Sequence, residues 1–258
     1  MNFEEDPLDL VDPWLDPADG ELWAFIVAGL SYGRVEQIKA SAIRLLRGWE
    51  KEGVGVHGQG LRNAILQGLR APRHWKHRLN TESDLNEALS MLSGALSQHQ
   101  SLASLYASCE QNSAEDHLQA FVDALRTFLP KRRHRTRSGT GGTWFCSSPR
   151  DGSTCKRFLM WLRWMVRKDH RDPGFWQNPK LYRAGQALPQ ASKLFSPVDT
   201  HIFQWARAQG ILRTQSPTWK SVLKITEEFR KRDPQDPLRW DFELSHEGMS
   251  QKRRVSLA

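Results

Sequence analysis

Two positions in this sequence combine a reactive side chain with the expected start of a helix. Lys156 opens a segment that runs to Asp169, and Asp199 opens a shorter apolar segment. A lysine amine is the nucleophile of Schiff-base chemistry. A carboxylate beside a reaction centre can stabilise a developing cation. The plain alternatives are a surface lysine whose alkyl chain covers apolar neighbours and an aspartate that only caps its helix.

The expected helix at Lys156 is strongly basic and strongly apolar at once, and Ser153 or Thr154 can cap it. Six basic residues and one acidic residue lie between positions 156 and 171. Successive helical residues are about 100° apart, so Lys156, Arg163 and Arg167 fall within one narrow stripe. The flanks of the stripe carry Arg157, Lys168, Trp161 and Trp164. Such a helix is too apolar to be free in solution and too basic to be wholly buried.

Asp199 is well placed to cap the second helix. Pro197 holds the preceding chain extended, and an aspartate at this position accepts hydrogen bonds from the first backbone N–H groups. Gly210 stands where glycine favours the end of a helix. We therefore expect a helix between Asp199 and Gly210 with a carboxylate at its start.

Helical periodicity dominates the rest of the chain. Apolar residues recur three and four positions apart, as in helices that pack one face on a core. The segments are 22–30, 35–46, 61–69, 84–96, 102–109 and 117–129. Start signals precede two of them, Thr81 with Asp84 and Ser113 with Asp116. No stretch alternates apolar and polar residues for more than a few positions, so the sequence predicts an all-α fold.

A basic stretch followed by glycines separates the helical segments. Residues 131–137 carry five fixed positive charges, and residues 138–142 include three glycines. We expect a flexible loop, either a solvated linker or a flap that contacts phosphates. One unit of 258 residues is then divided into an acidic N-terminal segment (1–21), a first helical lobe (22–130), the basic loop (131–153) and a second lobe (154–258).

The net charge is +8, from 37 Lys and Arg against 29 Asp and Glu. The first 21 residues hold eight of these acids and no base, so residues 22–258 carry 37 basic against 21 acidic residues. A body this basic, with eleven tryptophans, suits a polyanion such as nucleic acid. An ordinary basic protein is the other interpretation of the same charge.

Several classes of protein are disfavoured. The sequence contains no run of eighteen apolar residues, the length that could span a membrane. The acidic N-terminus is unlike a signal peptide, so we expect a cytoplasmic protein. The cysteines Cys109, Cys146 and Cys155 form no CxxC pair, which disfavours zinc and iron–sulfur sites. His74 and His77 with Glu82 or Asp84 could be assembled into a metal site, but no HExxH motif or carboxylate cluster supports one. We expect no metal and no cofactor.

Asp199 stands in the motif Val-Asp-Thr-His-Ile-Phe (198–203), which resembles a motif of the helix-hairpin-helix DNA glycosylase (HhH-GPD) superfamily, including endonuclease III. There this aspartate is catalytic, and a lysine that opens the preceding helix is the Schiff-base nucleophile of the bifunctional members. Residues 155–169 are similar to the matching element of a bacterial family of this type. That family shares an Asp-Pro-Leu-Asp start (6–9), a Ser/Ala-Tyr-Gly break (31–33) and a late Asp-Pro-x-Asp-Pro (233–237) before Asp-Phe (241–242).

The resemblance covers nearly the whole chain and implies a two-lobed glycosylase fold with a cleft between the lobes. It implies a monomeric, bifunctional enzyme (glycosylase and abasic-site lyase) of the bacterial nucleoid that acts on a damaged base in double-stranded DNA. The 43-residue spacing from Lys156 to Asp199 resembles the lengthened connection of archaeal 8-oxoguanine glycosylases, which points to an oxidised purine such as 8-oxoguanine. The glycine-containing hairpin and the iron–sulfur cysteines of endonuclease III are absent.

The resemblance also implies roles for individual residues. Lys156 and Asp199 are the catalytic pair, and residues 31–33 fall where relatives place the residue that fills the vacated base stack. The expected DNA contacts are Ser31, Tyr32, Gly33, Lys131, Arg132, Arg133, Arg157, Arg163, Arg167, Lys168 and His201. The expected base pocket is Trp161, Trp164, Trp176 and Tyr182.

Two other classes of function remain open. One is a non-catalytic nucleic-acid-binding protein that retains the glycosylase fold, which predicts salt-dependent binding without a product. The other is a structural or interaction module whose tryptophans pack the core and whose charges are solvated. It predicts weak DNA affinity without preference for a damaged base.

Overall fold

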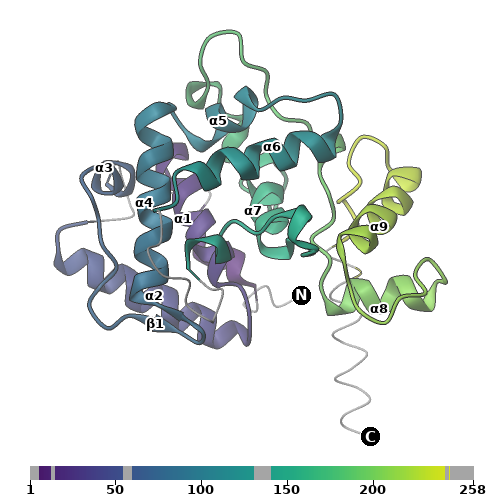
Figure 1. Ribbon diagram of the computed structural model, residues 1–258, viewed down its shortest axis with the longest axis horizontal. Coiled ribbons are helices and arrows are strands. Elements are labelled where there is room, and N and C mark those ends of the chain that lie inside the picture. Colours follow the sequence, from purple (N-terminus) through teal and green to yellow (C-terminus); the bar gives the residue numbers. More distant parts are fainter. Residues whose placement is uncertain (1–5, 13–14, 55–59, 131–140, 242–243, 245–258) are drawn as a thin grey trace, which may run out of the picture.

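The computed structural model describes residues 6–12, 15–54, 60–130, 141–241 and 244, and α-helices dominate it (Figure 1). The α-helices are α1 (Pro17–Leu30), α2 (Val35–Lys51), α3 (Leu61–Leu66), α4 (Glu82–Gln98), α5 (Leu102–Ser108), α6 (Ala114–Thr127), α7 (Lys156–Val166), α8 (Thr200–Ala208) and α9 (Trp219–Arg232). The 3₁₀ helices are η2 (Pro7–Leu10), η3 (Gly142–Trp144), η4 (Pro149–Asp151), η5 (Phe175–Gln177), η6 (Pro179–Leu181) and η7 (Ala191–Lys193). The predicted helical fold is confirmed. Among the described helices, none combines the length and hydropathy that crossing a bilayer requires.

α1 is the central helix. Asp16 caps it by accepting a hydrogen bond of 3.0 Å from the Ala18 N–H. Residues 22–30 are buried on every side, as expected for a helix that is apolar all round. α7 packs along α1, and the Trp161 indole donates a hydrogen bond of 3.0 Å to the Glu21 carbonyl oxygen. α7, which the sequence placed in the second lobe, is therefore anchored on a helix of the first.

The expected helix starts agree with the structure at α4, α6 and α8 but not at α7. Thr81 and Asp84 form a capping box at α4, and Ser113 caps α6. At α7 the N-cap is Cys155, which has a φ of 52° and makes no side-chain capping bond. The prediction that Ser153 or Thr154 caps this helix is wrong, because the backbone turns through the left-handed region only one residue before Lys156.

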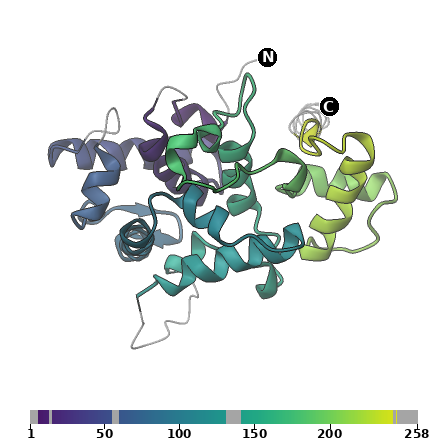
Figure 2. The same cartoon turned by 90° about the horizontal axis from the view of Figure 1, so that it is seen from above.

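α8 and α9 form an arm that stands beside the other helices (Figures 1 and 2). We use the word arm for residues 192–232. The Trp205 ring of α8 lies 5.6 Å from the Phe229 ring of α9, measured between centroids. The Ser196 N–H donates to Thr226 Oγ1 over 3.0 Å, which ties the chain before α8 to α9. The arm thus has internal packing of its own.

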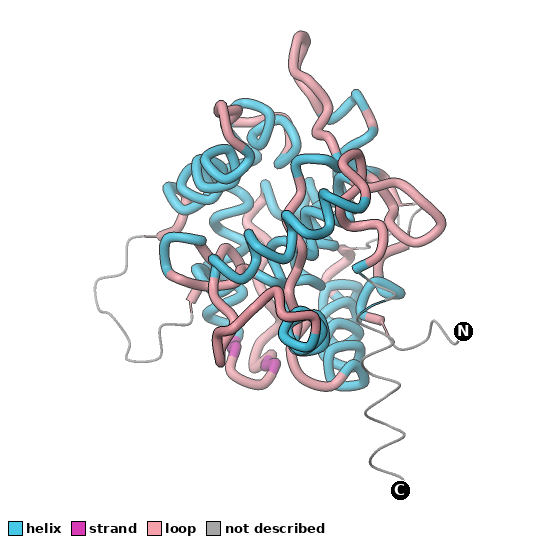
Figure 3. The backbone as a smooth tube through the Cα atoms, turned by 90° about the vertical axis from the view of Figure 1, so that its right-hand side faces the viewer, coloured by secondary structure: helices cyan, strands magenta, loops and turns pink. Residues whose placement is uncertain are grey.

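A small hairpin interrupts the helical pattern. β1 (Lys76–His77) pairs antiparallel with β2 (Asn80–Thr81), and Figure 3 shows both strands at the lower end of the molecule. The Tyr32 hydroxyl lies 2.8 Å from the His77 carbonyl oxygen and 2.7 Å from Asn80 Oδ1. These contacts fix the hairpin to the break at residues 31–33. Strands of two residues are too short to leave an alternating pattern in the sequence.

Candidate functional site

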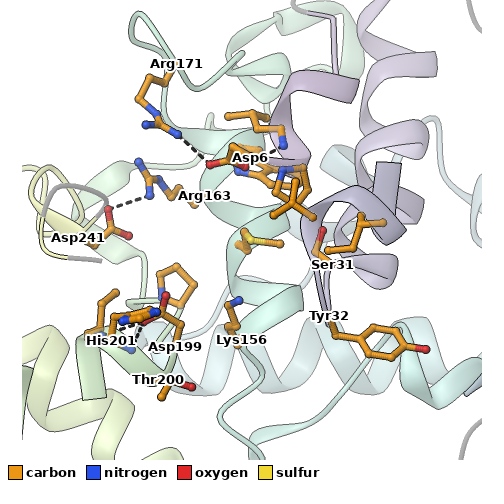
Figure 4. A pocket seen from close by; sticks show the side chains of 18 of the residues that line it. Asp6, Ser31, Tyr32, Lys156, Arg163, Arg171, Asp199, Thr200, His201 and Asp241 are labelled. Atoms are coloured by element: carbon orange, nitrogen blue, oxygen red, sulfur yellow. Dashed lines mark hydrogen bonds and ion pairs between the residues drawn. The ribbon is translucent and has the colours of Figure 1, made fainter. Parts of the chain in front are cut away.

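A cavity of about 360 Å³ lies between the starts of α7 and α8 and the break at residues 31–33 (Figure 4). Small-molecule sites in proteins usually have volumes of about 300–1,000 Å³. Its wall consists of residues 6–8, residues 31–33 with Val35 and Ile38, Lys156 with Met160, Arg163 and Trp164, Arg171 with Asp172, Pro197, residues 199–202, and Asp241. Segments from the whole length of the chain therefore meet at this cavity.

Lys156 is the first residue of α7, and its side chain points into the cavity (Figure 4). Met160 and Trp164 follow at intervals of four residues and line the same cavity, because residues at this spacing share one face of a helix. The opposite face of α7 carries Phe158, Leu162 and Met165 into the core. The buried face fixes the orientation of the helix, and the orientation aims the lysine amine at the cavity.

Asp199 is the N-cap of α8, as the sequence predicts. Its Oδ1 atom accepts hydrogen bonds of 2.8 Å from the N–H groups of His201 and of Ile202. Figure 4 shows the side chains of Lys156 and Asp199 on opposite sides of one open space. The structure therefore brings together the two residues that the sequence singled out for chemistry.

His201 lines the cavity next to Asp199. Its Nδ1 atom is buried and has no hydrogen-bond partner among the residues that the structure describes. The side chain is consequently available for a polar contact with a ligand in the cavity.

The expectation that Arg163 and Arg167 form a DNA-binding stripe is wrong. Arg163 forms ion pairs with Asp172 (3.1 Å) and Asp241 (2.8 Å), and its side chain is only 9% exposed. Arg167 pairs with Asp172, Asp169 (2.9 Å) and Asp236 (2.9 Å). Arg163 and Arg167 face acidic side chains inside the protein, whereas Lys156, the third residue of the predicted stripe, faces the cavity.

A third arginine extends this arrangement. Arg171 follows Arg167 by four residues and pairs with Asp6 over 3.0 Å. We call the set Arg163, Arg167 and Arg171 with Asp241, Asp236 and Asp6 the arginine clamp. Its acids come from the two ends of the described chain, in the motifs at residues 6–9 and 233–242. Burial raises the pKa of Asp172, which lies between Arg163 and Arg167.

Three of the four residues expected in a base pocket lie in the core instead. Trp161 and Trp176 are fully buried, and Tyr182 is 8% exposed. Trp176 donates a hydrogen bond of 2.8 Å to the Glu21 carboxylate, and Tyr182 donates one of 2.9 Å to the Trp176 carbonyl oxygen. Trp164, the fourth residue, does line the cavity. Sequence spacing does not distinguish an aromatic residue at a pocket from one in a core.

Residues 31–33 line the cavity, but two of their side chains are already engaged. Ser31 is buried and donates a hydrogen bond of 2.8 Å to the Val27 carbonyl oxygen. Besides its contacts with His77 and Asn80, the Tyr32 hydroxyl accepts from the Leu79 N–H over 3.2 Å. Gly33 is exposed and has a φ of 94°. Neither Ser31 nor Tyr32 is available to fill a base stack.

Two more of the expected DNA contacts, Arg157 and Lys168, are not part of the cavity wall. The Arg157 guanidinium lies 3.8 Å from the Trp144 ring centroid and donates to the Gly29 carbonyl oxygen over 3.2 Å. Burial lowers the pKa of Arg157 to about 10, and the side chain is not a free phosphate contact. Lys168 is exposed. Lys131, Arg132 and Arg133 lie outside the described residues.

Sequence reasoning missed four charged residues of the cavity wall: Asp6, Arg171, Asp172 and Asp241. Asp6 and Asp241 stand in the motifs at residues 6–9 and 233–242, which mark the family resemblance but indicate no role for either aspartate. Among the described residues, no group of three or more His, Cys, Asp or Glu side chains is arranged to hold a metal ion. His77 is buried, with its Nδ1 atom 2.9 Å from Ser41 Oγ.

The fold and the site define a helical protein with one lysine and one aspartate at the starts of two helices that share a cavity. The chain belongs to the family described as Protein of unknown function (DUF2400), whose model matches residues 6–250. No curated protein and no solved structure matches it.

Proposed function

We propose that this protein is a DNA glycosylase that excises a damaged base and also cleaves the strand at the resulting abasic site. The observation that carries the proposal is the shared cavity of Lys156 and Asp199, which lie at the starts of α7 and α8. The resemblance of residues 198–203 to the HhH-GPD motif implies that Asp199 is the catalytic carboxylate. It also implies that Lys156, which opens the preceding helix, is the Schiff-base nucleophile. The two-lobed glycosylase arrangement is part of the proposal.

In this mechanism the neutral amine of Lys156 attacks C1′ of the target nucleotide. The Asp199 carboxylate first accepts a proton from the lysine ammonium, which frees the amine, and passes that proton to the departing base. The new C1′–N bond forms as the glycosidic bond breaks, and its electron pair leaves with the protonated base. The Asp199 carboxylate, charged again, then stabilises the cationic character of the sugar. Opening of the sugar ring then gives an imine, which permits elimination of the 3′ phosphate.

The charges of the cavity favour a base over a phosphate as its occupant. With His201 counted as neutral, the charged groups of its wall are four carboxylates, one lysine and two arginines, so an entering phosphate would meet net negative charge. Apolar surface from Met160, Trp164 and Ile202 suits a flat base. Phosphates would instead bind at the rim, where Arg78 lies against Gly33 and the neighbouring Arg34 is exposed.

Leu79, at the tip of the hairpin, is the residue that we propose fills a vacated base stack. Its side chain is 65% exposed, and its backbone N–H donates a hydrogen bond to the Tyr32 hydroxyl. Exposed basic side chains, Lys76 and Arg78, flank it. Apolar side chains inserted between base steps are a recurrent device for distorting DNA. Leu79 takes the role that the sequence assigned to residues 31–33.

The partner in this proposal is double-stranded DNA with one damaged base, bound by a single copy of the protein in the bacterial nucleoid. An oxidised purine such as 8-oxoguanine is the first lesion to test.

The test is borohydride trapping on duplexes that carry 8-oxoguanine, uracil, thymine glycol, an abasic site or no lesion, with base release measured in parallel. Borohydride reduces the imine to a stable amine, so wild type and the surface control Lys224→Gln should give a covalent adduct and Lys156→Gln should not. Base release without an adduct would leave water as the nucleophile and refute the role of Lys156. Tight binding with neither adduct nor release would favour a non-catalytic DNA-binding protein.

A further inference from the structure

The proposed reaction needs two parts of the molecule to be held in register. Lys156 belongs to α7, which packs along α1. Asp199 belongs to the arm, whose helices pack on each other through Trp205 and Phe229. The arm stands beside the main body of helices (Figure 2). The distance between the amine and the carboxylate therefore depends on how the arm is attached to α7.

The segment that follows α9 supplies two attachments. Asp236 accepts hydrogen bonds from Arg167 Nε (2.9 Å) and Nη2 (2.9 Å), a bidentate contact that fixes both distance and direction. Asp241 pairs with Arg163 over 2.8 Å, and Figure 4 shows this pair at the edge of the space that Lys156 faces. Residues 233–241 continue directly from α9, so both contacts connect the arm to α7.

Both arginines are placed to transmit position to Lys156. Arg163 lies in α7, seven residues after Lys156, and Arg167 is the C-cap of the same helix, eleven residues after Lys156; both spacings are nearly whole numbers of helical turns. A helix is stiff over this length, since each turn is held by its own backbone hydrogen bonds. A contact that fixes the last turns of α7 relative to the arm also fixes the first turn, which carries the amine.

Arg163 and Arg167 each have a further carboxylate partner besides Asp241 and Asp236, so a variant can lose one contact with the arm without leaving a buried arginine unpaired. Without Asp236, Arg167 still pairs with Asp172 and Asp169. Without Asp241, Arg163 still pairs with Asp172. Removing either acid from the C-terminal segment therefore leaves the buried arginine with a carboxylate partner, which protects the fold while weakening one attachment of the arm.

We propose that Asp236 and Asp241 are positioning residues, which hold Arg167 and Arg163 and thereby keep the Asp199 carboxylate in register with the Lys156 amine. Their catalytic importance rests on the proposed function, whereas the attachment of the arm does not. The acidic motif at residues 233–242 acquires a role in this way, as the connection between the two halves of the site.

The first experiment measures the attachment without using activity. Nitroxide labels at Ser90→Cys on α4 and Gln209→Cys at the end of α8 would report the distance between body and arm by double electron–electron resonance. Both positions are exposed, Cys146 and Cys155 are buried, and Cys109→Ser removes the half-buried cysteine. We expect a narrow distribution for the otherwise native chain and a broadened or displaced one for Asp236→Asn and Asp241→Asn. Asp236→Glu should restore the narrow distribution.

Glu228→Gln is the matched control, because Glu228 lies on the same arm and pairs with Lys231 inside α9. It should leave the distribution unchanged. An unaltered distribution in both Asp236→Asn and Asp241→Asn would overturn the proposal, and so would equal broadening in the control.

The second experiment uses single-turnover borohydride trapping on an abasic-site duplex, which needs no knowledge of the lesion. Asp236→Asn should lower the trapping rate at least about tenfold, with a DNA Kd within about twofold of wild type and a Tm close to it. A broadened distance with an unchanged trapping rate would refute the positioning role. A wild-type protein that forms no adduct would refute the proposed function alone, because the distance measurement still tests the attachment.

Discussion

The Trp176 indole donates a hydrogen bond of 2.8 Å to a Glu21 carboxylate that has no exposed surface. The backbone N–H groups of Leu102 and Ala103 donate to the same carboxylate over 2.9 and 3.2 Å. Burial is the largest influence and raises the pKa of Glu21 from 4.5 to about 7, although the three donors favour the charged form. This carboxyl group joins α1, α5 and the segment around Trp176, so its protonation bears on the stability of the core.

We expect the free energy of unfolding to contain a pH-dependent contribution from Glu21. With a higher pKa in the folded state, the folded protein binds more protons than the unfolded chain between about pH 4.5 and 7. The contribution is fully present below pH 4.5 and is lost as pH rises through about 7, and its size is about 3 kcal/mol. Urea unfolding of wild type and Glu21→Gln at pH 5 and pH 8 measures it.

The glutamine of Glu21→Gln remains neutral at pH 5 and at pH 8. The free energy of unfolding of this variant, relative to that of wild type, should therefore increase from pH 5 to pH 8. The exposed Glu50→Gln serves as the control and should follow wild type. Parallel pH profiles for wild type and Glu21→Gln would show that Glu21 does not titrate in this range.

Asp199→Asn separates the proposed catalytic role of the carboxylate from its role as a helix cap. Asparagine caps helices about as well as aspartate, so Tm should change little. Loss of the negative charge should slow base release by about 100-fold or more, since that is the usual cost of removing an electrostatic stabiliser of a transition state. Base release at the wild-type rate on the best lesion of the panel would disprove the assignment.

Leu79→Ala tests the hairpin tip as the residue that fills the vacated stack. We expect base release from duplex DNA to fall about tenfold, and release from a single strand with the same lesion to stay near wild type, because only the duplex has a stack to fill. Leu188→Ala is the control, because Leu188 is also exposed (41%) but does not line the cavity. Equal losses on duplex and single strand would show that Leu79 does not act on the stack.

Replacing the basic residues between positions 131 and 137 with alanine tests the phosphate-contacting interpretation of that loop. Each lost phosphate contact should flatten the plot of log affinity against log salt concentration by about 0.9. Affinity should fall about equally on all sequences, because phosphates carry no sequence information. Titrations at several salt concentrations measure the slope, and a slope identical to that of wild type would identify the segment as a linker.

The parts of the site that could be predicted from sequence are those determined by local rules. Asp199 was predicted as a helix cap because capping involves only the next few residues. The meeting of Lys156 and Asp199 in one cavity was expected from the family motif and from neither helix alone.

The partners of Arg163 and Arg167 could not be predicted in the same way. Helical spacing places both arginines on one stripe, but the acids that neutralise them come from positions 172, 236 and 241. For Trp161 and Trp176, burial depends on how α7 and the segment after it pack against Glu21 of α1. The sequence pattern carries the type of side chain, whereas its surroundings depend on contacts between distant segments.

The cavity wall includes residues 6–8 at one end of the described chain and Asp241 at the other. During synthesis, a nascent chain that ends just after α7 already contains Lys156 and Asp6 but not yet Asp199, Asp236 or Asp241. The amine therefore acquires its carboxylate partner and its closed surroundings only after translation has passed position 241. The wall of the cavity is complete only when residue 241 has been made, and proteolytic loss of residues 6–8 or of Asp241 would remove part of it.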